Sequence, residues 1–357
     1  MQIVFLAPYA KFITPTQRFR FEHYLPFLYE RKLKYSYVTF VTEKDSKTLL
    51  LHGKNIQKLI IILIGIIKRL FLFLTIFKYD FVYIHREIIP IGPPIFEWFL
   101  AKVLKKKIIY DFDDAIWLSI SSEANPKIAK IKCTWKVSKI CSYSHIVTVG
   151  NEYLGVYAKQ FCNDVRVIPT VVDTEFYHNK VKNQNEKPLT IGWTGSFTTL
   201  KYLNSVIPVI EKLKQRYEFD FLIIANKDPK FTTIDYNYLE WDSDSEIKDL
   251  LKMNIGIMPL LDTAIELGKC GFKAIQYMSL GIPAVVSPIG ANVKIVIDNE
   301  NGFLATDFDE WYEKLEILLS SLELRNALGD SARNYIINNY SITSTKSMFL
   351  DLFKNKN

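Results

Sequence analysis

The sequence has little cysteine, little histidine and none of the spacings that mark a metal or disulfide site. Its 357 residues include 4 cysteines and 5 histidines, and Gly and Pro number 14 each. Four cysteines without a Cys-x-x-Cys pair exclude a disulfide scaffold and a zinc or redox motif, so we expect reduced thiols and no metal ion. The modest Gly and Pro content excludes collagen-like and low-complexity chains.

We expect no export signal at the N-terminus. Residues 1–8 (MQIVFLAP) are a short apolar run without a basic start or a cleavage site, and they predict a first β-strand. We therefore expect a cytoplasmic protein.

One long hydrophobic run, residues 59–77 (LIIILIGIIKRLFLFLTIF), has two charges, Lys68 and Arg69, near its middle. Charge is costly inside a bilayer, which disfavours a membrane-spanning helix. The run instead predicts a helix packed on a core or lying at a membrane interface. We favour packing in the core, with interfacial contact as the further option.

The positive charge lies in the first third of the chain. Residues 1–107 hold 18 Lys and Arg against 7 Asp and Glu, a net of +11, whereas the rest holds 27 against 31. Such a segment suits an anionic partner, namely nucleic acid, an anionic membrane or a phosphorylated substrate. A general Lys-rich composition is the alternative explanation.

Strand patterns alternate with helical patterns throughout, which predicts parallel sheets covered by helices. The expected strands are 2–7, 35–42, 81–85, 107–110, 146–149 and 165–168, then 189–193, 219–225, 255–259 and 283–287. The expected helices of the second half are 199–217, 245–253, 270–280, 310–321, 323–339 and 344–353. We predict an α/β chain of two doubly wound Rossmann-like domains facing a cleft: residues 1–175, a polar linker 176–188, residues 189–340, and a C-terminal helical segment 341–357 that crosses back.

Two glycine-containing turns in the second half lead into helices. Gly195 and Ser196 follow a strand, and Lys201 comes in the next turn; glycine, a capping hydroxyl and free helix N–H groups suit a phosphate. The second turn contains Lys269, Gly271 and Lys273, whose lysines are four residues apart and share a helix face. A plain turn and a solvated lysine face are the alternatives, and two such turns together suggest one diphosphate.

Three further segments carry a family resemblance: residues 167–177 (VIPTVVDTEFY), 272–290 (FKAIQYMSLGIPAVVSPIG) and 301–304 (NGFL). They are similar, in that order, to the interdomain segment, the donor-nucleotide helix with its following strand, and the next turn of family 4 retaining glycosyltransferases of the GT-B fold. The resemblance is in particular to those that assemble bacterial surface polysaccharides. The resemblance implies a sugar transferred from a nucleotide diphosphate donor to a hydroxyl of a glycan or lipid-linked acceptor, with retention and without a metal ion or other cofactor.

The resemblance also implies the donor-side residues. Lys201 matches the lysine that contacts the diphosphate, and the family's two glutamates fall on Gly268 and Gln276, where this chain departs from the pattern. Gln276 can still hydrogen-bond a hydroxyl, and either Glu266 or Lys269 replaces the first glutamate. The predicted donor set is Gly195, Ser196, Lys201, Glu266, Lys269, Gly271, Phe272, Lys273 and Gln276, with Lys201 and Lys269 as catalytic cations.

Charged residues at two strand ends of the first half are candidates for the acceptor side. The stretch 110–115 (YDFDDA) contains an Asp-x-Asp pair that a dehalogenase-like phosphatase would use as nucleophile and acid, but a hydroxyl residue is missing where Ala115 stands. We instead place Asp113 and His85 among the catalytic candidates. The predicted acceptor contacts are Arg18, Arg20, Arg86 and Asp114. A capped strand end for His85, and pairing of Arg86 with Glu87 or Asp113, are the alternatives.

The sequence thus predicts a glycosyltransferase whose acceptor is polyprenyl-phosphate-linked or another glycan, with peripheral contact to the inner face of an anionic membrane. No base-reading motif supports nucleic acid as a partner. A GT-B sugar-nucleotide epimerase and a non-catalytic nucleotide-sugar-binding protein are the alternatives.

Overall fold

The computed structural model describes residues 1–50, 55–118 and 133–354, which form two compact units. Unit 1 comprises Met1–Pro169 and Lys346–Asn357, and unit 2 comprises Thr170–Thr345. Residues 176–188, predicted as a linker, belong to unit 2. There the Lys182 N–H donates to the Leu280 carbonyl at 2.8 Å, and the Gln184 side chain donates to the Gly281 carbonyl at 3.3 Å.

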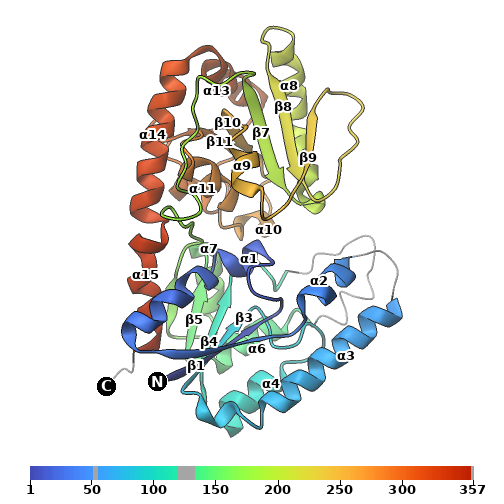
Figure 1. Ribbon diagram of the computed structural model, residues 1–357, viewed down its shortest axis with the longest axis vertical. Coiled ribbons are helices and arrows are strands. Elements are labelled where there is room, and N and C mark those ends of the chain that lie inside the picture. The colour runs from blue at the N-terminus through green and yellow to red at the C-terminus, as the bar shows by residue number, and fades with distance from the viewer. Residues whose placement is uncertain (51–54, 119–132, 355–357) are drawn as a thin grey trace. The chain divides into compact units, whose positions relative to one another are not determined.

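Unit 1 is built on a six-stranded parallel sheet in the order β2-β1-β3-β4-β5-β6 (Figure 1). Its strands are β1 Gln2–Ala7, β2 Lys34–Thr39, β3 Phe81–His85, β4 Lys107–Phe112, β5 Ile146–Val149 and β6 Val165–Val167. The central strands β1, β3 and β4 are almost continuously apolar and buried, as parallel strands covered on both faces must be.

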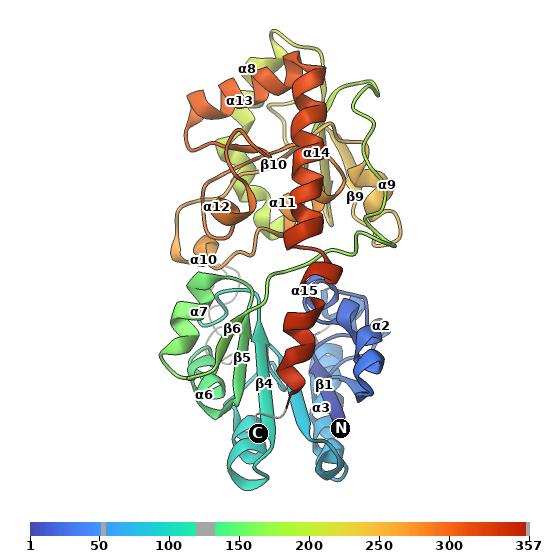
Figure 2. The same cartoon turned by 90° about the vertical axis from the view of Figure 1, so that its left-hand side faces the viewer.

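Helices of 3 to 18 residues connect these strands. They are α1 Pro15–Arg18, the 3-10 helix η1 Glu22–Arg31, α2 Glu43–Leu50, α3 Asn55–Leu72, η2 Ile76–Lys78, α4 Ile95–Trp98, the π-helix η3 Phe99–Val103, α6 Lys136–Tyr143 and α7 Glu152–Lys159. The chain returns to unit 1 at its end through α15 Ile342–Leu350 and η5 Asp351–Phe353 (Figure 2). Phe349 of α15 stacks on Tyr24 of η1 at 4.5 Å between ring centroids, which anchors the returning segment.

Unit 2 contains a second six-stranded parallel sheet, in the order β12-β11-β10-β7-β8-β9. Its strands are β7 Thr190–Gly195, β8 Asp220–Ala225, β9 Asn237–Glu240, β10 Ile255–Met258, β11 Ala284–Val286 and β12 Phe303–Leu304. Its helices are the 3-10 helix η4 Phe197–Ser205, then α8 Ile207–Lys214, α9 Glu246–Leu250, α10 Ala264–Leu267, α11 Phe272–Ser279, α12 Asn292–Ile295, α13 Phe308–Ser320 and α14 Leu322–Asn339. The predicted doubly wound α/β class is confirmed.

The strand order of each sheet reverses at one point, and ligands of such sheets bind beside the strand ends at that point. In unit 2 the reversal lies between β7 and β10, where Tyr277 of α11 bridges the two strands. Its hydroxyl accepts from the Thr194 N–H at 2.9 Å and donates to the Ile257 carbonyl at 3.4 Å. In unit 1 the reversal lies between β1 and β3.

The structure corrects three expectations about elements. The strands β9 and β12 were missed because one is a short edge strand with exposed ends and the other has two residues. The predicted helix 199–217 is two helices, η4 and α8, which are divided at Val206. Pro208, in the first turn of α8, has no N–H with which to continue the backbone hydrogen bonds of η4.

The prediction that residues 59–77 pack mainly in the core is wrong. In α3 only Ile61, Gly65 and Arg69 are buried, and most of the apolar side chains face outward. None of the helices within the described ranges is long and apolar enough to cross a membrane.

Candidate functional site

The first part of the candidate site in unit 2 is the turn after β7. Ser196 is the N-cap of η4: its N–H donates to the Thr199 hydroxyl at 3.1 Å, and that hydroxyl donates to the Ser196 carbonyl at 2.9 Å. The Phe197 N–H is held by the Asn226 side chain at 2.7 Å. A Cβ on Gly195 would lie 2.4 Å from Trp193 Cζ2, so the turn requires glycine. The predicted Gly195 and Ser196 therefore lie at a tightly fixed, exposed turn beside the strand reversal.

The second part of this site is the turn that leads into α11. Gly271, the N-cap, has a φ of 66°, and a Cβ there would lie 2.1 Å from Ile295 Cδ1. Both the backbone angle and the close approach require glycine. The glycine allows the chain to enter α11 with the helix N-terminus beside the β7–β10 reversal.

Gly271→Ala is expected to lower the free energy of unfolding by about 1–3 kcal/mol, because a left-handed residue gains a side chain that collides with Ile295. Chemical denaturation measures the loss. Gly92→Ala is the matched control, since Gly92 has a φ of 77° but open space around its Cβ position. If both variants lose the same stability, the close approach to Ile295 contributes nothing.

Glu266 of α10 is fixed by two hydroxyl groups. The Tyr202 hydroxyl donates to its Oε1 and the Thr263 hydroxyl to its Oε2, and the residue is only 1% exposed. Burial acts to raise the pKa of Glu266, but these two hydrogen bonds and nearby Lys201 outweigh it, so the pKa is lowered. Glu266 is thus a preorganised carboxylate beside the predicted lysines.

Three lysines lie at the two turns, Lys201 near the Glu266 carboxylate and Lys269 and Lys273 at the entry to α11. Lys201 is exposed, with its Nζ 5.2 Å from the Tyr202 ring centroid, and Lys269 is half-buried. Lys273 lies over Trp193, 5.5 Å from the ring centroid. Burial and the charge of Lys269 lower the pKa of Lys273 to about 8. The arrangement concentrates positive charge at the reversal, as an anionic ligand requires.

Gln276 of α11 is 2% exposed, and its Nε2 has no hydrogen-bond partner within the described residues. A buried amide donor without a partner is costly in an empty protein, which fits a group that a ligand satisfies. Phe272 begins the same helix, and Gly268 caps α10 with ordinary backbone angles. The nine predicted donor residues thus all lie in or beside β7, η4, α10 and α11 of unit 2.

The candidate residues of unit 1 lie at the carboxyl ends of neighbouring strands. Register pairs His85 of β3 with Asp111 of β4, and Asp111 with Thr148 of β5. His85 Nδ1 lies 2.8 Å from Asp111 Oδ2, the Thr148 hydroxyl donates to Oδ1 at 2.7 Å, and Arg20 Nη2 donates to Oδ1 at 2.5 Å. All four residues are buried.

The electrostatics of this network follow from the Arg20 charge. Burial would raise the pKa of Asp111, but Arg20 and His85 hold it well below its usual range. Because an ionised carboxylate only accepts, His85 Nδ1 carries the hydrogen, and His85 Nε2 has no partner within the described residues. Arg20 also donates to the Ile168 carbonyl. Predicted as an acceptor contact, Arg20 therefore lies inside unit 1 as the counter-charge of Asp111.

The remaining acceptor candidates lie around the same strand ends. Arg86, at a φ of 62°, donates to Asp113 Oδ1 at 2.8 and 3.1 Å, which confirms the alternative that these two residues pair. Burial would raise the pKa of Asp113, but Arg86, His85 and Arg20 together lower it. Asp114 caps the Ala115 N–H at 3.1 Å, and Arg18 lies over the Phe19 ring at 4.3 Å. Roles for these residues in acceptor binding stay predictions.

Several residues that shape the sites were missed from the sequence. Tyr202 and Thr263 orient Glu266, Trp193 supports Lys273, and Thr148 completes the Asp111 network. Thr148 could have been found, because it lies near the end of β5, the strand that neighbours the one carrying Asp111. Within the described ranges no group of three His, Cys, Asp or Glu residues is placed to hold a metal ion.

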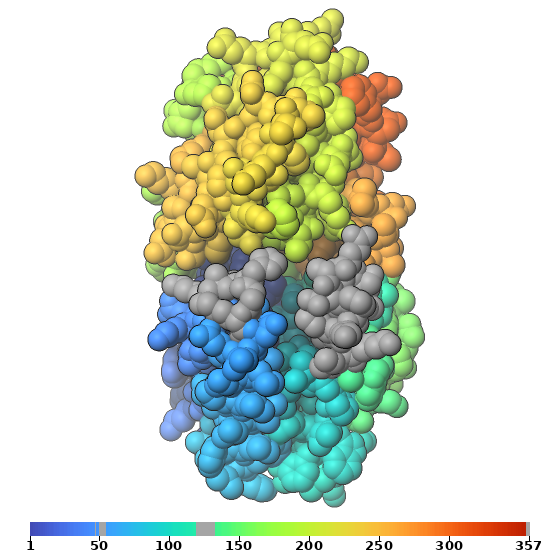
Figure 3. Space-filling view, turned by 90° about the vertical axis from the view of Figure 1, so that its right-hand side faces the viewer, coloured from blue at the N-terminus to red at the C-terminus, as the bar shows by residue number. Residues whose placement is uncertain are grey.

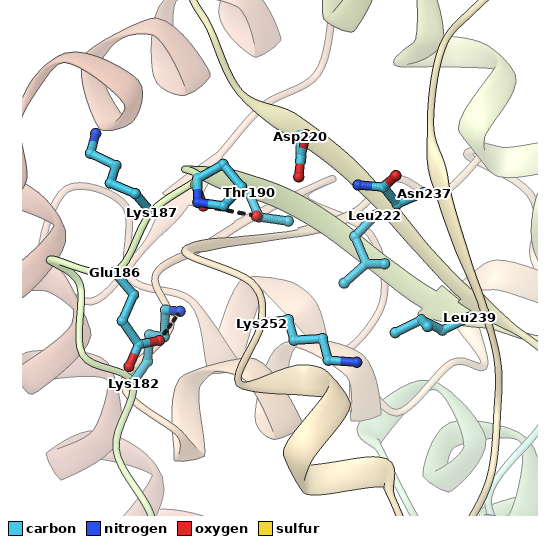
Figure 4. Close-up of a pocket in the computed structure, with 10 residues that line it drawn as sticks. Lys182, Glu186, Lys187, Thr190, Asp220, Leu222, Asn237, Leu239 and Lys252 are labelled. Atoms are coloured by element: carbon cyan, nitrogen blue, oxygen red, sulfur yellow. Dashed lines mark hydrogen bonds and ion pairs between the residues drawn. The ribbon is translucent and has the colours of Figure 1, made fainter.

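A cavity of about 330 Å³ in unit 2 lies away from this site (Figure 4). It is lined by Thr190 and Asp220, the first residues of β7 and β8, and by the Lys182–Glu186 ion pair at 2.8 Å. These are the amino ends of the strands, so the cavity is at the opposite sheet edge from Gly195.

Part of the chain, all of it within unit 2, matches a known family model. Residues 174–335 match the family model described as Glycosyl transferases group 1. The fold is GT-B. No curated protein sequence matches the chain.

Similar solved structures span nearly the whole chain. A sucrose-phosphate synthase from Thermosynechococcus elongatus has a TM-score of 0.70 at 12% identity, covering 99% of this chain and 98% of that one. A glycosyltransferase from Rickettsia africae ESF-5 has a TM-score of 0.69 at 16% identity, covering 99% of both chains. Anabaena HepE in complex with UDP-glucose has a TM-score of 0.67 at 12% identity, covering 98% of both. The GT-B architecture of the two sheets is therefore confirmed.

Proposed function

We propose that the chain is a glycosyltransferase that binds a nucleotide diphosphate sugar at the β7–β10 reversal of unit 2. The observation that carries the proposal is the gathering of Lys201, Lys269 and Lys273 around two glycine turns that only glycine can form. Backbone N–H groups and lysine charge at such turns complement a diphosphate. The family match of residues 174–335, and the UDP-glucose bound to the similar Anabaena protein, support this choice of donor class.

In the proposed reaction, the bond between the anomeric carbon and the diphosphate oxygen breaks while an acceptor hydroxyl forms the new glycosidic bond. Negative charge develops on the departing diphosphate, and Lys201 and Lys269 offset it in place of a metal ion. The departing phosphate oxygen takes the hydroxyl proton, so attack and departure occur on one face and the anomeric configuration is retained. Glu266 or Lys269 holds the sugar, and Gln276 binds a nucleotide hydroxyl.

Unit 1 is proposed to bind the acceptor. Its strand ends carry His85, Arg86 and Asp113, and its first 107 residues hold the positive excess of the chain. Positive charge suits a phosphate-linked acceptor, such as a glycan on a polyprenyl phosphate, in assembly of a bacterial surface polysaccharide. We place the reaction at the inner face of the cell membrane.

Thermal unfolding with UDP-, GDP-, ADP- and TDP-linked sugars tests the donor, because a ligand of the native state raises the unfolding midpoint. The donor found is then incubated with the protein, and release of the nucleoside diphosphate is followed with and without glycan acceptors. Transfer, or slow donor hydrolysis, supports the proposal. Binding without any turnover would indicate a non-catalytic binder, and a changed sugar released without acceptor would indicate an epimerase.

Nucleotide affinity is expected to fall as pH rises above about 8. Lys273, whose pKa is about 8, is charged below that pH, and a bound diphosphate favours its charged form. Binding above pH 8 therefore takes up a proton, and affinity falls by up to about tenfold per pH unit. Calorimetric titration of UDP between pH 7 and 9.5, in buffers of different ionisation enthalpy, measures the uptake. Lys273→Gln should remove it; a variant with the same pH profile would show that another group titrates.

A further inference from the structure

The helix α3 presents an apolar face to solvent. Eight of its apolar side chains are between 45% and 77% exposed, including Leu59, Leu63, Ile67 and Phe71. They recur three or four residues apart, so they form one stripe along the helix. Figure 3 shows α3, in light blue, on the outer surface of unit 1. A contiguous apolar stripe of this length on a folded domain indicates an interaction surface.

The orientation of α3 is fixed from the inside. The Arg69 guanidinium is fully buried and donates to the Ala7, Val38 and Ile88 carbonyls at 2.9, 3.1 and 3.3 Å. Four residues earlier, Gly65 contacts the Phe40 ring so closely that a Cβ would lie 2.5 Å from it. Ile61, Gly65 and Arg69 therefore face the core, while most of the apolar residues of α3 face out. Turning the stripe inward would break the three Arg69 hydrogen bonds.

The apolar surface extends beyond the helix. Phe73 packs against Phe96 and Phe99 at about 5 Å between ring centroids, which joins α3 to α4 and η3. On α4, Trp98 is 45% exposed. The stripe also continues to Phe77, 66% exposed, which lines a hollow of about 590 Å³. The charged residues of the hollow are Lys105, Lys106 and Lys107 and one carboxylate, Asp80, so positive charge prevails there. Lysines beside an apolar surface are the arrangement of a face that meets anionic head groups.

Charge distinguishes an anionic lipid surface from a second copy of the chain. Residues 46–79 contain no Asp or Glu, but they include Lys58, Lys68 and Lys78 along and beyond α3. Two such helices facing each other would bring lysines together without a carboxylate from either helix. An anionic bilayer accepts the apolar stripe among its acyl chains and the lysines among its head groups.

We propose that the outward face of α3, continued by Trp98 and the Phe77 hollow, docks unit 1 on an anionic lipid bilayer without crossing it. The proposal identifies which surface of unit 1 would contact the membrane at which the proposed reaction is placed. It rests on the proposed function only for the reason why the chain would bind a membrane. The Arg69 hydrogen bonds hold the helix with this face outward.

Flotation of the full chain with lipid vesicles tests the proposal. Vesicles with about 30 mol% phosphatidylglycerol in phosphatidylcholine should bind the chain about tenfold or more better than phosphatidylcholine alone. The double substitution Leu63→Glu with Ile67→Glu should lower that binding about tenfold or more, because both side chains are 50% exposed in the stripe. Val156→Glu, at a 64% exposed valine on α7 of the same unit, should bind as the original chain does.

Two further measurements make the outcome decisive. Thermal unfolding of the double variant should be unchanged, and its shift by UDP should persist, so that a failed membrane proposal is distinguished from a failed nucleotide site. Sedimentation velocity gives the oligomeric state. Absence of vesicle binding, equal binding by the double variant, or a dimer that the double substitution dissociates would each overturn the proposal.

Discussion

Asp111→Ala is expected to lower the free energy of unfolding by about 3–5 kcal/mol, the cost of leaving one charge of a buried pair without its partner. The substitution would remove the carboxylate that pairs with the Arg20 guanidinium, a residue only 2% exposed. It would also remove the acceptor of the Thr148 and His85 hydrogen bonds. Urea denaturation followed by far-UV circular dichroism measures the loss. The affected transition should be that of unit 1, which contains all four residues.

Asp113→Ala is the matched control, because the Asp113 and Arg86 side chains are 12% and 28% exposed and solvent can take over part of the pairing. Its loss should be about 1 kcal/mol. The pH dependence adds a second criterion. Since the pKa of Asp111 is depressed in the folded state, its contribution is complete above the unfolded value near 4 and is lost as pH falls below it. Equal losses for the two variants at neutral pH would mean that burial of the Arg20–Asp111 pair is energetically unimportant.

Lys201→Ala is expected to lower kcat/KM for sugar transfer about 100-fold or more, with unchanged stability. Lys201 is exposed, and its side chain makes no hydrogen bond to the described residues that a truncation would remove. Its charge would instead face a diphosphate that gains charge as it departs. Initial rates with the donor identified by thermal shift measure the effect. A loss in kcat as well as in kcat/KM is expected, because the interaction strengthens in the transition state.

Lys248→Ala provides the comparison for that loss, since Lys248 is an exposed lysine of α9 in the same unit. It should keep full activity. Lys201→Arg should retain more activity than Lys201→Ala, because it restores the charge with a different geometry. Full activity of Lys201→Ala would contradict the proposed phosphate site.

The architecture was predictable because its signals are local. The strands at 2–7, 81–85 and 146–149 are short apolar runs between turn residues, and they have the predicted bounds. The edge strand β9 carries no such signal, since Asn237 and Glu240 at its ends are exposed and its burial depends on β8 alone. Local pattern therefore identifies the inner strands and the outer strands β2 and β6, but it misses the outer strands β9 and β12.

The candidate site was predictable only in part. Gly195, Gly271 and the lysines could be predicted, because glycine and lysine at strand-to-helix turns are visible in the sequence. The partners of Glu266 do not: Tyr202 lies 64 residues before it, and nothing in either segment marks the pair. Arg69 shows the same limit. In the sequence it interrupts an apolar run, and only the fold reveals that this residue faces inward while its apolar neighbours face out.

The return of α15 to unit 1 determines the order in which the two units can be completed during synthesis. Phe353 contacts Phe5 and Phe81 at 6.1 and 5.8 Å between ring centroids, and Phe349 lies 5.9 Å from Tyr83. These partners lie in β1 and β3, which leave the ribosome first. Unit 2 is encoded without interruption between them. Part of the aromatic core of the unit 1 sheet therefore stays uncovered until unit 2 and the returning α15 segment have been translated.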